Sequence, residues 1–374
     1  MPEKFTEVTR VGLGKRIVES FVGMIFGIIL FIASFVVLWI NEGRIDMSKI
    51  AKLAIAVNPN VIEATAEGKL VSVTDKLESP QMIGDPKYLK PGSYINLVRE
   101  VEMYAWVEQE VTKTEKKFGG EEIRTTTYTY TKEWTSSPEE SSSFKYPEGH
   151  ENPAMPVREE SFFVQTASVG AYEISPTSVD LPPSTSFPLT AENVILDKEA
   201  ELVGNYIFIG QGSLAEPQIG DLRISFKTVR TGIPVTLFGK LEGGKVVPYY
   251  HKGGHRLYRV LSGSRDEAIA KMATEHRVFT WILRGVGFLM MWLGLFLFFG
   301  PINVILDIVP FLGGVSRGLI GILTFAVALV LSSVTIIISM IAHNIIALVV
   351  VIGLMIGGIW FWRKRKKAER KIAV

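Results

Sequence analysis

The stretch that decides the fold is Gly318–Trp362, which reads GLIGILTFAVALVLSSVTIIISMIAHNIIALVVVIGLMIGGIWFW. Its 45 residues include one ionisable side chain, that of His343. Crossing the hydrocarbon core of a bilayer takes about 20 apolar residues in a helix. The stretch is therefore long enough for two membrane-spanning helices, expected over 318–341 and 344–362, with a short turn at His343-Asn344.

Two further apolar stretches precede this pair. Residues 20–41 and 285–306 contain no Asp, Glu, Lys, Arg or His, and we expect spans over 20–41 and 284–306. The first is longer than the apolar core of a secretory signal, about 7–15 residues, and ends in Asn41-Glu-Gly-Arg44 without a small-residue cleavage site. It is interpreted as an uncleaved span, so the chain is predicted to have four transmembrane helices.

The basic residues of the chain predict its orientation. The segment 1–19 and the tail 363–374 are rich in Lys and Arg, which favour the cytoplasmic side of a membrane. Both termini are therefore expected in the cytoplasm, together with an interfacial loop over 307–317. Residues 42–283 would form a domain on the extracytoplasmic or lumenal side.

Charge and cysteine content exclude several function classes. The chain has 40 Lys+Arg against 38 Asp+Glu, so it lacks the dense basic surface that general nucleic-acid binding requires. It has no cysteine, which excludes disulfides, thiolate nucleophiles and cysteine-ligated metal centres. We expect membrane lipids as partners, no nucleic acid and no cofactor.

The large segment between the first two spans has the pattern of β-strands. Apolar and polar residues alternate over 68–74, 95–110 and 124–134, and Lys117–Glu121 is typical of a hairpin turn between the last two. A second strand-rich block covers 206–209, 222–226 and 234–239. The predicted fold class is a membrane protein of α+β type, with a large β-rich extramembrane domain inserted between helices 1 and 2.

Two helices are predicted within or beside this domain. Thr190 is a candidate N-cap for a helix over 191–202, with Glu192 in its first turn. The polar segment Arg265–Arg277 has the composition of a helix that continues into the second span.

Several segments together resemble a known family. Val101-Glu-Met-Tyr-Ala-Trp-Val-Glu108, Gly149-His-Glu-Asn-Pro153 and Gly220-Asp-Leu-Arg-Ile-Ser-Phe226 are similar, in order and spacing, to segments of the LUMA (transmembrane protein 43) family. So are Asn41–Arg44, Glu67–Val71, Glu133-Trp134 and Thr280-Trp281. The resemblance implies four spans, a large lumenal domain and a scaffold role at the nuclear envelope and endoplasmic reticulum. It also implies self-association, contacts with lamina-linked membrane proteins and no established enzymatic activity.

Three motifs were weighed as sites of chemistry. Gly314-Val-Ser-Arg-Gly318 matches the nucleophile elbow, but small residues at the start of a span explain it better. His251 and His255 flank two glycines, which favours a solvent-exposed loop over a metal site. His150 lies among polar residues and prolines, as in a turn. No catalytic, cofactor-binding or metal-binding residue is therefore predicted.

Small and hydroxyl-bearing residues in the spans are the candidate helix-packing sites. Glycines spaced by four let helices approach closely, and hydroxyls can bond between helices. The residues concerned are Gly23, Gly27, Ser332, Ser333, Thr335, Gly353 and Gly357.

We expect a non-catalytic scaffold that self-associates, as a homo-oligomer, or binds other membrane proteins. A lipid- or ligand-binding module that uses apolar residues such as Phe279 and Trp281 is the alternative, ahead of a membrane-bound hydrolase acting through Ser316 or a transporter. The expected location is the cytoplasmic (inner) membrane for a prokaryotic chain, and the endoplasmic reticulum or inner nuclear membrane for a eukaryotic one.

Overall fold

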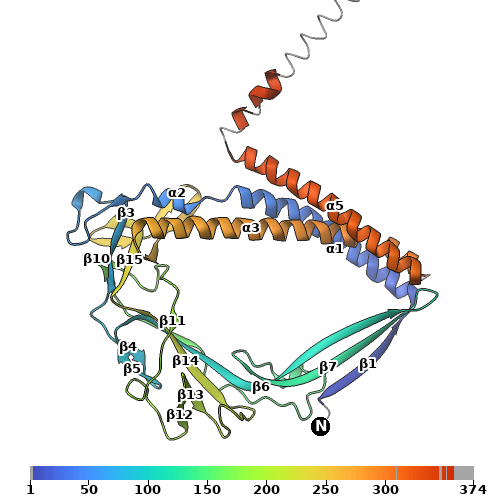
Figure 1. The fold of residues 1–374 in the computed structure, drawn as a ribbon, viewed down its shortest axis with the longest axis horizontal. Helices are drawn as coiled ribbons and strands as arrows, with labels where there is room; N and C mark the ends of the chain where they lie inside the picture. Colours follow the sequence, from blue (N-terminus) through green and yellow to red (C-terminus); the bar gives the residue numbers. More distant parts are fainter. Residues whose placement is uncertain (1–2, 309, 345–347, 351, 358–374) are drawn as a thin grey trace, which may run out of the picture. The chain divides into compact units, whose positions relative to one another are not determined.

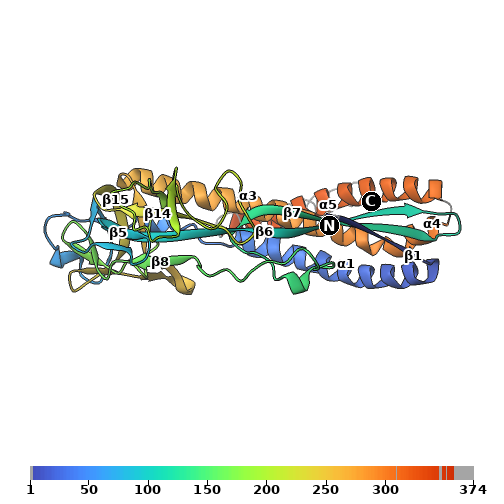
Figure 2. The same cartoon turned by 90° about the horizontal axis from the view of Figure 1, so that it is seen from below.

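The computed structural model describes residues 3–308, 310–344, 348–350 and 352–357. The chain divides into two compact units (Figure 1, Figure 2). The β-rich unit comprises residues 1–7, 46–112 and 125–275. The helical unit comprises residues 8–45, 113–124 and 276–374.

The larger sheet has eight strands among the described residues, with β1, β7, β6, β14, β13 and β12 as neighbours in that order. In addition, β11 pairs with β14 and β8 pairs with β6. The bounds are Lys4–Val11 (β1), Tyr94–Lys116 (β6), Glu122–Thr135 (β7), Glu160–Phe163 (β8), Thr185–Ser186 (β11), Ala200–Val203 (β12), Tyr206–Ile209 (β13) and Leu222–Arg230 (β14).

The second sheet has the order β19-β15-β16-β10-β9-β3-β2, and β15 also pairs with β3. Its bounds are Ile55–Ala56 (β2), Leu70–Glu78 (β3), Ala167–Val169 (β9), Tyr172–Ile174 (β10), Ile233–Glu242 (β15), Lys245–Val247 (β16) and Arg259–Ser262 (β19). Two small sheets pair Ile83–Asp85 (β4) with Leu89–Gly92 (β5) and Tyr249–His251 (β17) with His255–Leu257 (β18). Short helices cover Met47–Ala51 (α2), Ala64–Ala66, Ser141–Ser143 and Lys252–Gly254.

The burial of each strand follows from its neighbours. Along β14, Leu222, Ile224 and Phe226 are buried while the residues between them are half-exposed, as in a strand with one face on a core. Strand β15 is buried continuously over 235–239, because it is central: Leu237 lies opposite Val73 of β3 and Val260 of β19. Each sheet thus has its own apolar core.

The strands predicted from alternation over 95–110 and 124–134 are confirmed within β6 and β7, and β3 covers residues 70–74 of the predicted strand 68–74. The predicted strand 206–209 coincides with β13, and 222–226 and 234–239 lie within β14 and β15. The hairpin predicted around Lys117–Glu121 joins β6 to β7.

The helix predicted over 191–202 is wrong. Residues 191–193 and 198–199 form turns, Val194 forms an isolated β-bridge with Leu89, and Ala200–Val203 is strand β12. The Asn193 side chain accepts from the Thr190 N–H at 2.9 Å and donates to the Pro188 carbonyl oxygen at 3.1 Å. Such local side-chain bonds compete with helix formation. Val194 and Ala200 are buried in the core of the larger sheet, which favours this conformation further.

The helix predicted over 265–277 is confirmed as the start of α3, Arg265–Phe298. Ser264 and Glu267 begin it with a capping box. The Glu267 carboxylate accepts from the Ser264 N–H at 2.8 Å, and the Ser264 hydroxyl accepts from the Glu267 N–H at 3.5 Å. The helix then continues without a break into its apolar half.

The helical unit contains α1 (Leu13–Glu42), most of α3, α4 (Gly300–Leu306) and α5 (Pro310–Ala342). By length and composition, three helical segments of the described residues can cross a membrane: Leu13–Ala51, Arg265–Phe298 and Gly314–Ala342. A shorter apolar helix, Leu348–Gly357, falls within the expected fourth span, and the rest of 344–362 lies largely outside the described residues. The apolar run 285–306 is divided at Gly300-Pro301, where α4 begins as a separate helix.

Candidate functional site

Asn152, in the segment Gly149–Pro153, binds the backbone of β6. Its side-chain oxygen accepts from the Trp106 N–H at 2.7 Å, and its side-chain nitrogen donates to the Trp106 carbonyl oxygen at 2.9 Å. The same nitrogen donates to the Glu139 carbonyl oxygen at 3.0 Å. The Asn152 amide thus bonds to both the N–H and the carbonyl group of Trp106, as the backbone of a neighbouring strand would.

His150 lies inside an aromatic cluster and not in an open site. Its ring stacks on Tyr130 with centroids 3.9 Å apart and meets Trp106 edge-on at 4.8 Å. Its Nδ1 lies 3.0 Å from the Tyr146 carbonyl oxygen. The Tyr130 hydroxyl donates to Glu108, and burial together with this bond raises the pKa of Tyr130 to about 12. The cluster joins β6 and β7 to the 144–152 loop.

The segment Gly220–Phe226 is also tied into the fold. The buried Asp221 carboxylate accepts from the N–H groups of Gln211, Gly212 and Gln218 at 2.7–3.1 Å. Because the carboxylate accepts three backbone N–H groups, it holds the 210–220 loop closed.

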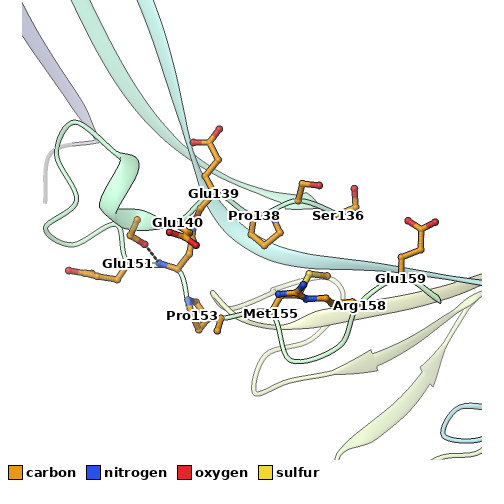
Figure 3. A pocket seen from close by; sticks show the side chains of 13 residues that line it. Ser136, Pro138, Glu139, Glu140, Glu151, Pro153, Met155, Arg158 and Glu159 are labelled. Carbon is orange, nitrogen blue, oxygen red and sulfur yellow. Dashed lines mark hydrogen bonds between the residues drawn. The ribbon is translucent and has the colours of Figure 1, made fainter.

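A cavity of about 860 Å³ lies beside the Asn152 loop (Figure 3). The side chains around it include Glu139, Glu140, Glu151 and Glu159, with Arg158 as a cation. Among the described residues, no three His, Asp or Glu side chains form a group able to hold a metal ion.

The two histidines of the 251–255 motif and the serine of Gly314–Gly318 lie in different elements of the structure. His251 and His255 lie opposite each other on β17 and β18. Ser316 lies inside α5, where helix precedes it, whereas a nucleophile elbow needs a strand at that position.

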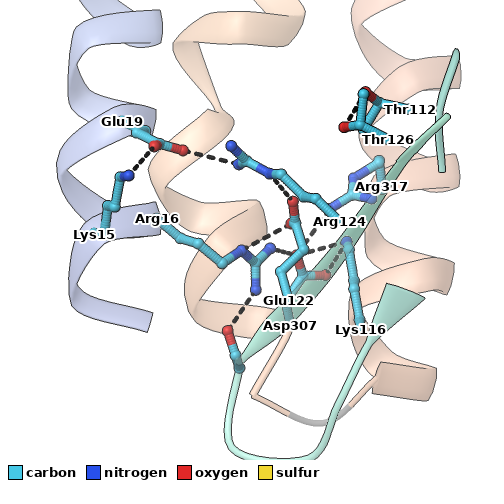
Figure 4. Close-up of polar contacts among 11 residues, drawn as sticks. Lys15, Arg16, Glu19, Thr112, Lys116, Glu122, Arg124, Thr126, Asp307 and Arg317 are labelled. Atoms are coloured by element: carbon cyan, nitrogen blue, oxygen red, sulfur yellow. Dashed lines mark hydrogen bonds and ion pairs between the residues drawn. The ribbon is translucent and has the colours of Figure 1, made fainter. Parts of the chain in front are cut away.

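The strongest concentration of buried charge is in the helical unit, around Asp307. This carboxylate follows α4 and is fully buried. Arg16 of α1 lies 2.5 Å from its Oδ2, Lys116 of the hairpin 2.6 Å from its Oδ1 and Arg317 of α5 2.8 Å from its Oδ2 (Figure 4). Three segments far apart in sequence therefore converge on one carboxylate.

The cations explain how the charge of Asp307 is kept in a buried place. Burial alone would raise the pKa of this carboxyl, but hydrogen bonds from Lys116 and Arg16 outweigh it and hold the pKa below its usual range. Burial also lowers the pKa of Lys116, against the pull of Asp307. Removing one partner of such a buried group leaves the others uncompensated, so the cluster is sensitive to substitution.

A second layer of ion pairs surrounds the first. Arg16 Nε lies 3.0 Å from Glu122, and Glu122 also accepts from Arg124 Nε at 2.6 Å. Arg124 reaches Glu19 of α1 at 2.9 Å. We call the eight residues of both layers the Asp307 cluster: Lys15, Arg16, Glu19, Lys116, Glu122, Arg124, Asp307 and Arg317. Its five cations outnumber its three carboxylates.

Two glycines allow the hairpin tip, residues 113–124, to enter this cluster. Gly119 and Gly120 have φ of 86° and 78°, a conformation that glycine adopts without strain. The Gly119 N–H donates to the Ile308 carbonyl oxygen at 3.1 Å, and the Gly120 carbonyl accepts from Arg16 at 2.7 Å. A Cβ at Gly120 would lie 2.7 Å from the side chain of Leu13.

The position of the tip bears on the expected topology. Arg16 lies near the start of α1, while residues 46–112 follow its other end. The orientation expected from the basic flanks assigns Arg16 and residues 113–124 to opposite sides of a membrane. The docked tip lies beside Arg16, so it does not fit an assignment to the opposite side. If α1 crosses the membrane completely, the strands that lead from residues 46–112 to the tip would have to cross as well, and polar strands do not cross lipid.

A cavity of about 280 Å³ adjoins the cluster. Arg124, Arg317 and Asn303 line it, and so do Gly23, Phe296 and Leu297. The Asn303 side chain is only 4% exposed, and its oxygen has no hydrogen-bond partner among the described residues. A buried acceptor without a hydrogen bond costs free energy of folding, so a donor supplied by a ligand would stabilise this oxygen.

The opposite end of the helices is held by a second ion pair. Arg284 of α3 forms two hydrogen bonds with the Glu42 carboxylate, at 2.7 and 2.8 Å. The Asn41 side chain donates to the Thr280 carbonyl oxygen at 3.0 Å. These contacts involve two of the segments that carried the family resemblance.

The predicted packing glycines have different surroundings. A Cβ at Gly27 would lie 2.7 Å from the carbonyl oxygen of Gly294, so α1 and α3 approach backbone to backbone there. A Cβ at Gly23, Gly353 or Gly357 would meet nothing within 4 Å among the described residues.

The predicted hydroxyl residues bond locally or are exposed. Ser332 donates to the Leu329 carbonyl oxygen at 3.2 Å and Thr335 to that of Leu331 at 2.7 Å, both within α5. Ser333 is exposed. The Ser339 hydroxyl does bond to another helix, since it donates to the Trp39 carbonyl oxygen of α1 at 3.1 Å.

Sequence reasoning did not identify the Asp307 cluster, Gly294 or Asn303. One signal was present, since Asp307 is the one acid in the otherwise apolar region between the second and third spans. Its partners at positions 16 and 116 are too distant in sequence for any spacing rule to connect them.

The family model and the similar proteins found by comparison all point to one family. The family model for transmembrane protein 43 matches residues 103–345. Transmembrane protein 43 of Mus musculus is 28% identical over 327 residues, covering 82% of this chain and 81% of that protein. The Homo sapiens protein is 29% identical over 321 residues, covering 80% and 79%, and the Drosophila melanogaster homolog is 29% identical over 287 residues, covering 72% and 74%.

No solved structure matches the chain. The family match covers more than half of the chain, and the described residues contain helices long and apolar enough to cross a membrane. The chain is an integral membrane protein and belongs to the transmembrane protein 43 family.

Proposed function

We propose that the chain is a non-catalytic, multi-pass membrane scaffold. In this proposal the spans anchor the β-rich unit, which lies on the extracytoplasmic or lumenal side and binds other envelope proteins, while the helices self-associate. The relatives are named as transmembrane proteins, without an activity in their names. A eukaryotic chain of this kind would be in the endoplasmic reticulum or inner nuclear membrane.

The use of the polar residues supports a scaffold. Asn152, Asp221 and His150, in the segments that resemble the family, are occupied by bonds that hold loops to strands. Side chains engaged in this way stabilise a rigid surface and are not free to act on a substrate.

The observation that carries self-association is the open face of Gly353 and Gly357. These glycines are four residues apart on a helix, so they share one face. Since no described residue packs on them, that face is free for a second helix of small-residue type. Gly27, by contrast, is used inside the protomer.

The test is native mass spectrometry of the full-length protein released from mild detergent. We expect a discrete homo-oligomer, which Gly353→Leu and Gly357→Leu should convert to monomer. Gly285→Leu is the matched control, because Gly285 also faces open space but has no glycine four residues away. A monomeric native protein would overturn self-association, and dissociation by the control alone would overturn its assignment to the face of Gly353 and Gly357.

The aromatic residues near Glu42 support membrane anchoring. Trp281 and Phe279 are exposed, and Arg284 and Arg44 lie over their rings at 4.7 and 4.3 Å. Trp and cationic side chains together are typical of the membrane–water interface. This end of α3 is therefore proposed to lie at that level.

A further inference from the structure

We infer that the cavity beside the Asp307 cluster binds a phosphate ester that carries a free hydroxyl group, as in the headgroup of an anionic glycerophospholipid. The inference does not rest on the scaffold proposal. It concerns one site in the helical unit, between α1, the hairpin tip and α3–α5.

The first argument is charge. The charged residues that line the cavity are the cations Arg16, Arg124 and Arg317 and the carboxylates Glu19 and Glu122, so the lining carries one more cation than carboxylates. These two side chains are 35% and 40% exposed, whereas Arg16 is 4% exposed and has all its nitrogens bonded within the cluster. Guanidinium groups bind phosphate oxygens in a planar, two-point geometry.

The second argument is the unpaired oxygen of Asn303. It is buried, it belongs to a cavity-lining residue, and among the described residues it accepts no hydrogen bond. A ligand that reaches it must bring a donor. An ammonium group would be repelled by Arg124 and Arg317, so a hydroxyl group is the better match.

The third argument is the apolar side of the cavity. Phe296 and Leu297, near the end of α3, line it opposite the arginines. Gly23 of α1 also lines it, and no atom of the described residues would lie within 4 Å of a Cβ at this position. A volume of about 280 Å³ suits a headgroup, with acyl chains left to follow the apolar faces of the helices outside.

The test is native mass spectrometry of the full-length protein in mild detergent, with phosphatidylglycerol or phosphatidylcholine added. We expect one phosphatidylglycerol retained per protomer, about tenfold more tightly than phosphatidylcholine. Both lipids carry the phosphate, but the glycerol headgroup also brings a hydroxyl donor for Asn303, and one hydrogen bond of ordinary strength corresponds to about this factor. Soluble glycerol phosphate is the competitor: displacement at equal concentration would identify a free phosphate ester as the ligand, and no displacement a lipid. Equal retention of both lipids, with no glycerol phosphate bound, would overturn the inference.

Variants locate the site. Gly23→Leu should fill the cavity and lower retention tenfold or more, whereas Gly14→Leu, on the same helix with open space and away from the cavity, should not. Arg124→Gln and Arg317→Gln should each act in the same direction, and Lys117→Gln, a tip cation outside the cavity, should have no effect. Unchanged retention in Gly23→Leu would place the lipid elsewhere. The same spectra report oligomer size and bound lipid separately. Failure of the proposed self-association can therefore be distinguished from failure of the proposed lipid site.

Discussion

The side-chain amide of Asn152 forms two hydrogen bonds with the backbone of Trp106, one to its N–H at 2.7 Å and one to its carbonyl oxygen at 2.9 Å. Both residues lie in segments by which the chain resembles its family, although 46 positions separate them. The pairing joins the Gly-His-Glu-Asn-Pro loop to a tryptophan-containing strand, because the amide completes the hydrogen bonding of the strand at that point.

We predict that Asn152→Ala lowers the free energy of unfolding of the β-rich unit by about 2 kcal/mol, because it removes the three hydrogen bonds of the amide and leaves both Trp106 backbone groups without that partner. Chemical denaturation of the full-length protein in detergent, followed by tryptophan fluorescence, measures this. Asn60→Ala, at an exposed asparagine, is the matched control and should change the midpoint little. Equal effects of the two variants would contradict the role assigned to Asn152.

Asp307→Asn should destabilise the helical unit by about 3–5 kcal/mol, because it leaves Arg16, Lys116 and Arg317 without their shared counter-charge. Thermal unfolding in detergent provides the measurement. Glu115→Gln removes an exposed carboxylate of the same hairpin tip, which pairs with Lys117 among the described residues, and should be near neutral.

The pH dependence of the free energy of unfolding tests whether Asp307 is charged in the folded protein. The pKa of Asp307 is below that of an unfolded carboxyl, near 3.9, so its contribution is fully present above about pH 4 and is lost as the pH falls through the folded value. The wild type should therefore lose more stability than Asp307→Asn on acidification below about pH 4. Parallel curves for the two proteins would show that the cluster does not hold the carboxylate charged.

Gly27→Leu should disrupt the crossing of α1 and α3, whereas Gly23→Leu should leave it intact. A Cβ at Gly27 would lie 2.7 Å from backbone atoms of Gly294, and backbone cannot move aside cheaply. Gly23 has open space at the same distance. Thermal stability of the two variants in detergent tests this, and equal destabilisation would show that both glycines face the same helix.

The elements that depend on local pattern could be predicted from the sequence, and those that depend on distant contacts could not. Strand β14 alternates apolar and polar residues over Leu222–Phe226, which reports directly on one buried face. The region 191–202 has a cap and helix-forming residues, yet Asn193 bonds to Thr190 and Pro188 and prevents the helix. Asp307 and its partner Arg16 are 291 positions apart, and no sequence spacing indicates that they pair.

The docked hairpin tip makes a prediction about sidedness. Arg16, Lys116 and Asp307 share one cluster, so residues 113–124 and the start of α1 must be on the same side of the membrane. The chain has no cysteine, which makes single-cysteine labelling clean. Phe118→Cys and Lys15→Cys, at positions whose side chains are 83% and 70% exposed, should react with a membrane-impermeant maleimide from the same side of sealed vesicles.

Met82→Cys, at an exposed position of the β-rich unit, supplies the reference for the remainder of 42–283. If Phe118→Cys labels with Met82→Cys and opposite to Lys15→Cys, the one-sided domain expected from the basic flanks holds and the Asp307 cluster is open in the membrane. If all three label together, α1 does not cross completely. In the third outcome, Phe118→Cys labels with Lys15→Cys and opposite to Met82→Cys. The hairpin would then cross the membrane, and the helices would have to shield it, because charged strands do not pass through hydrocarbon unprotected.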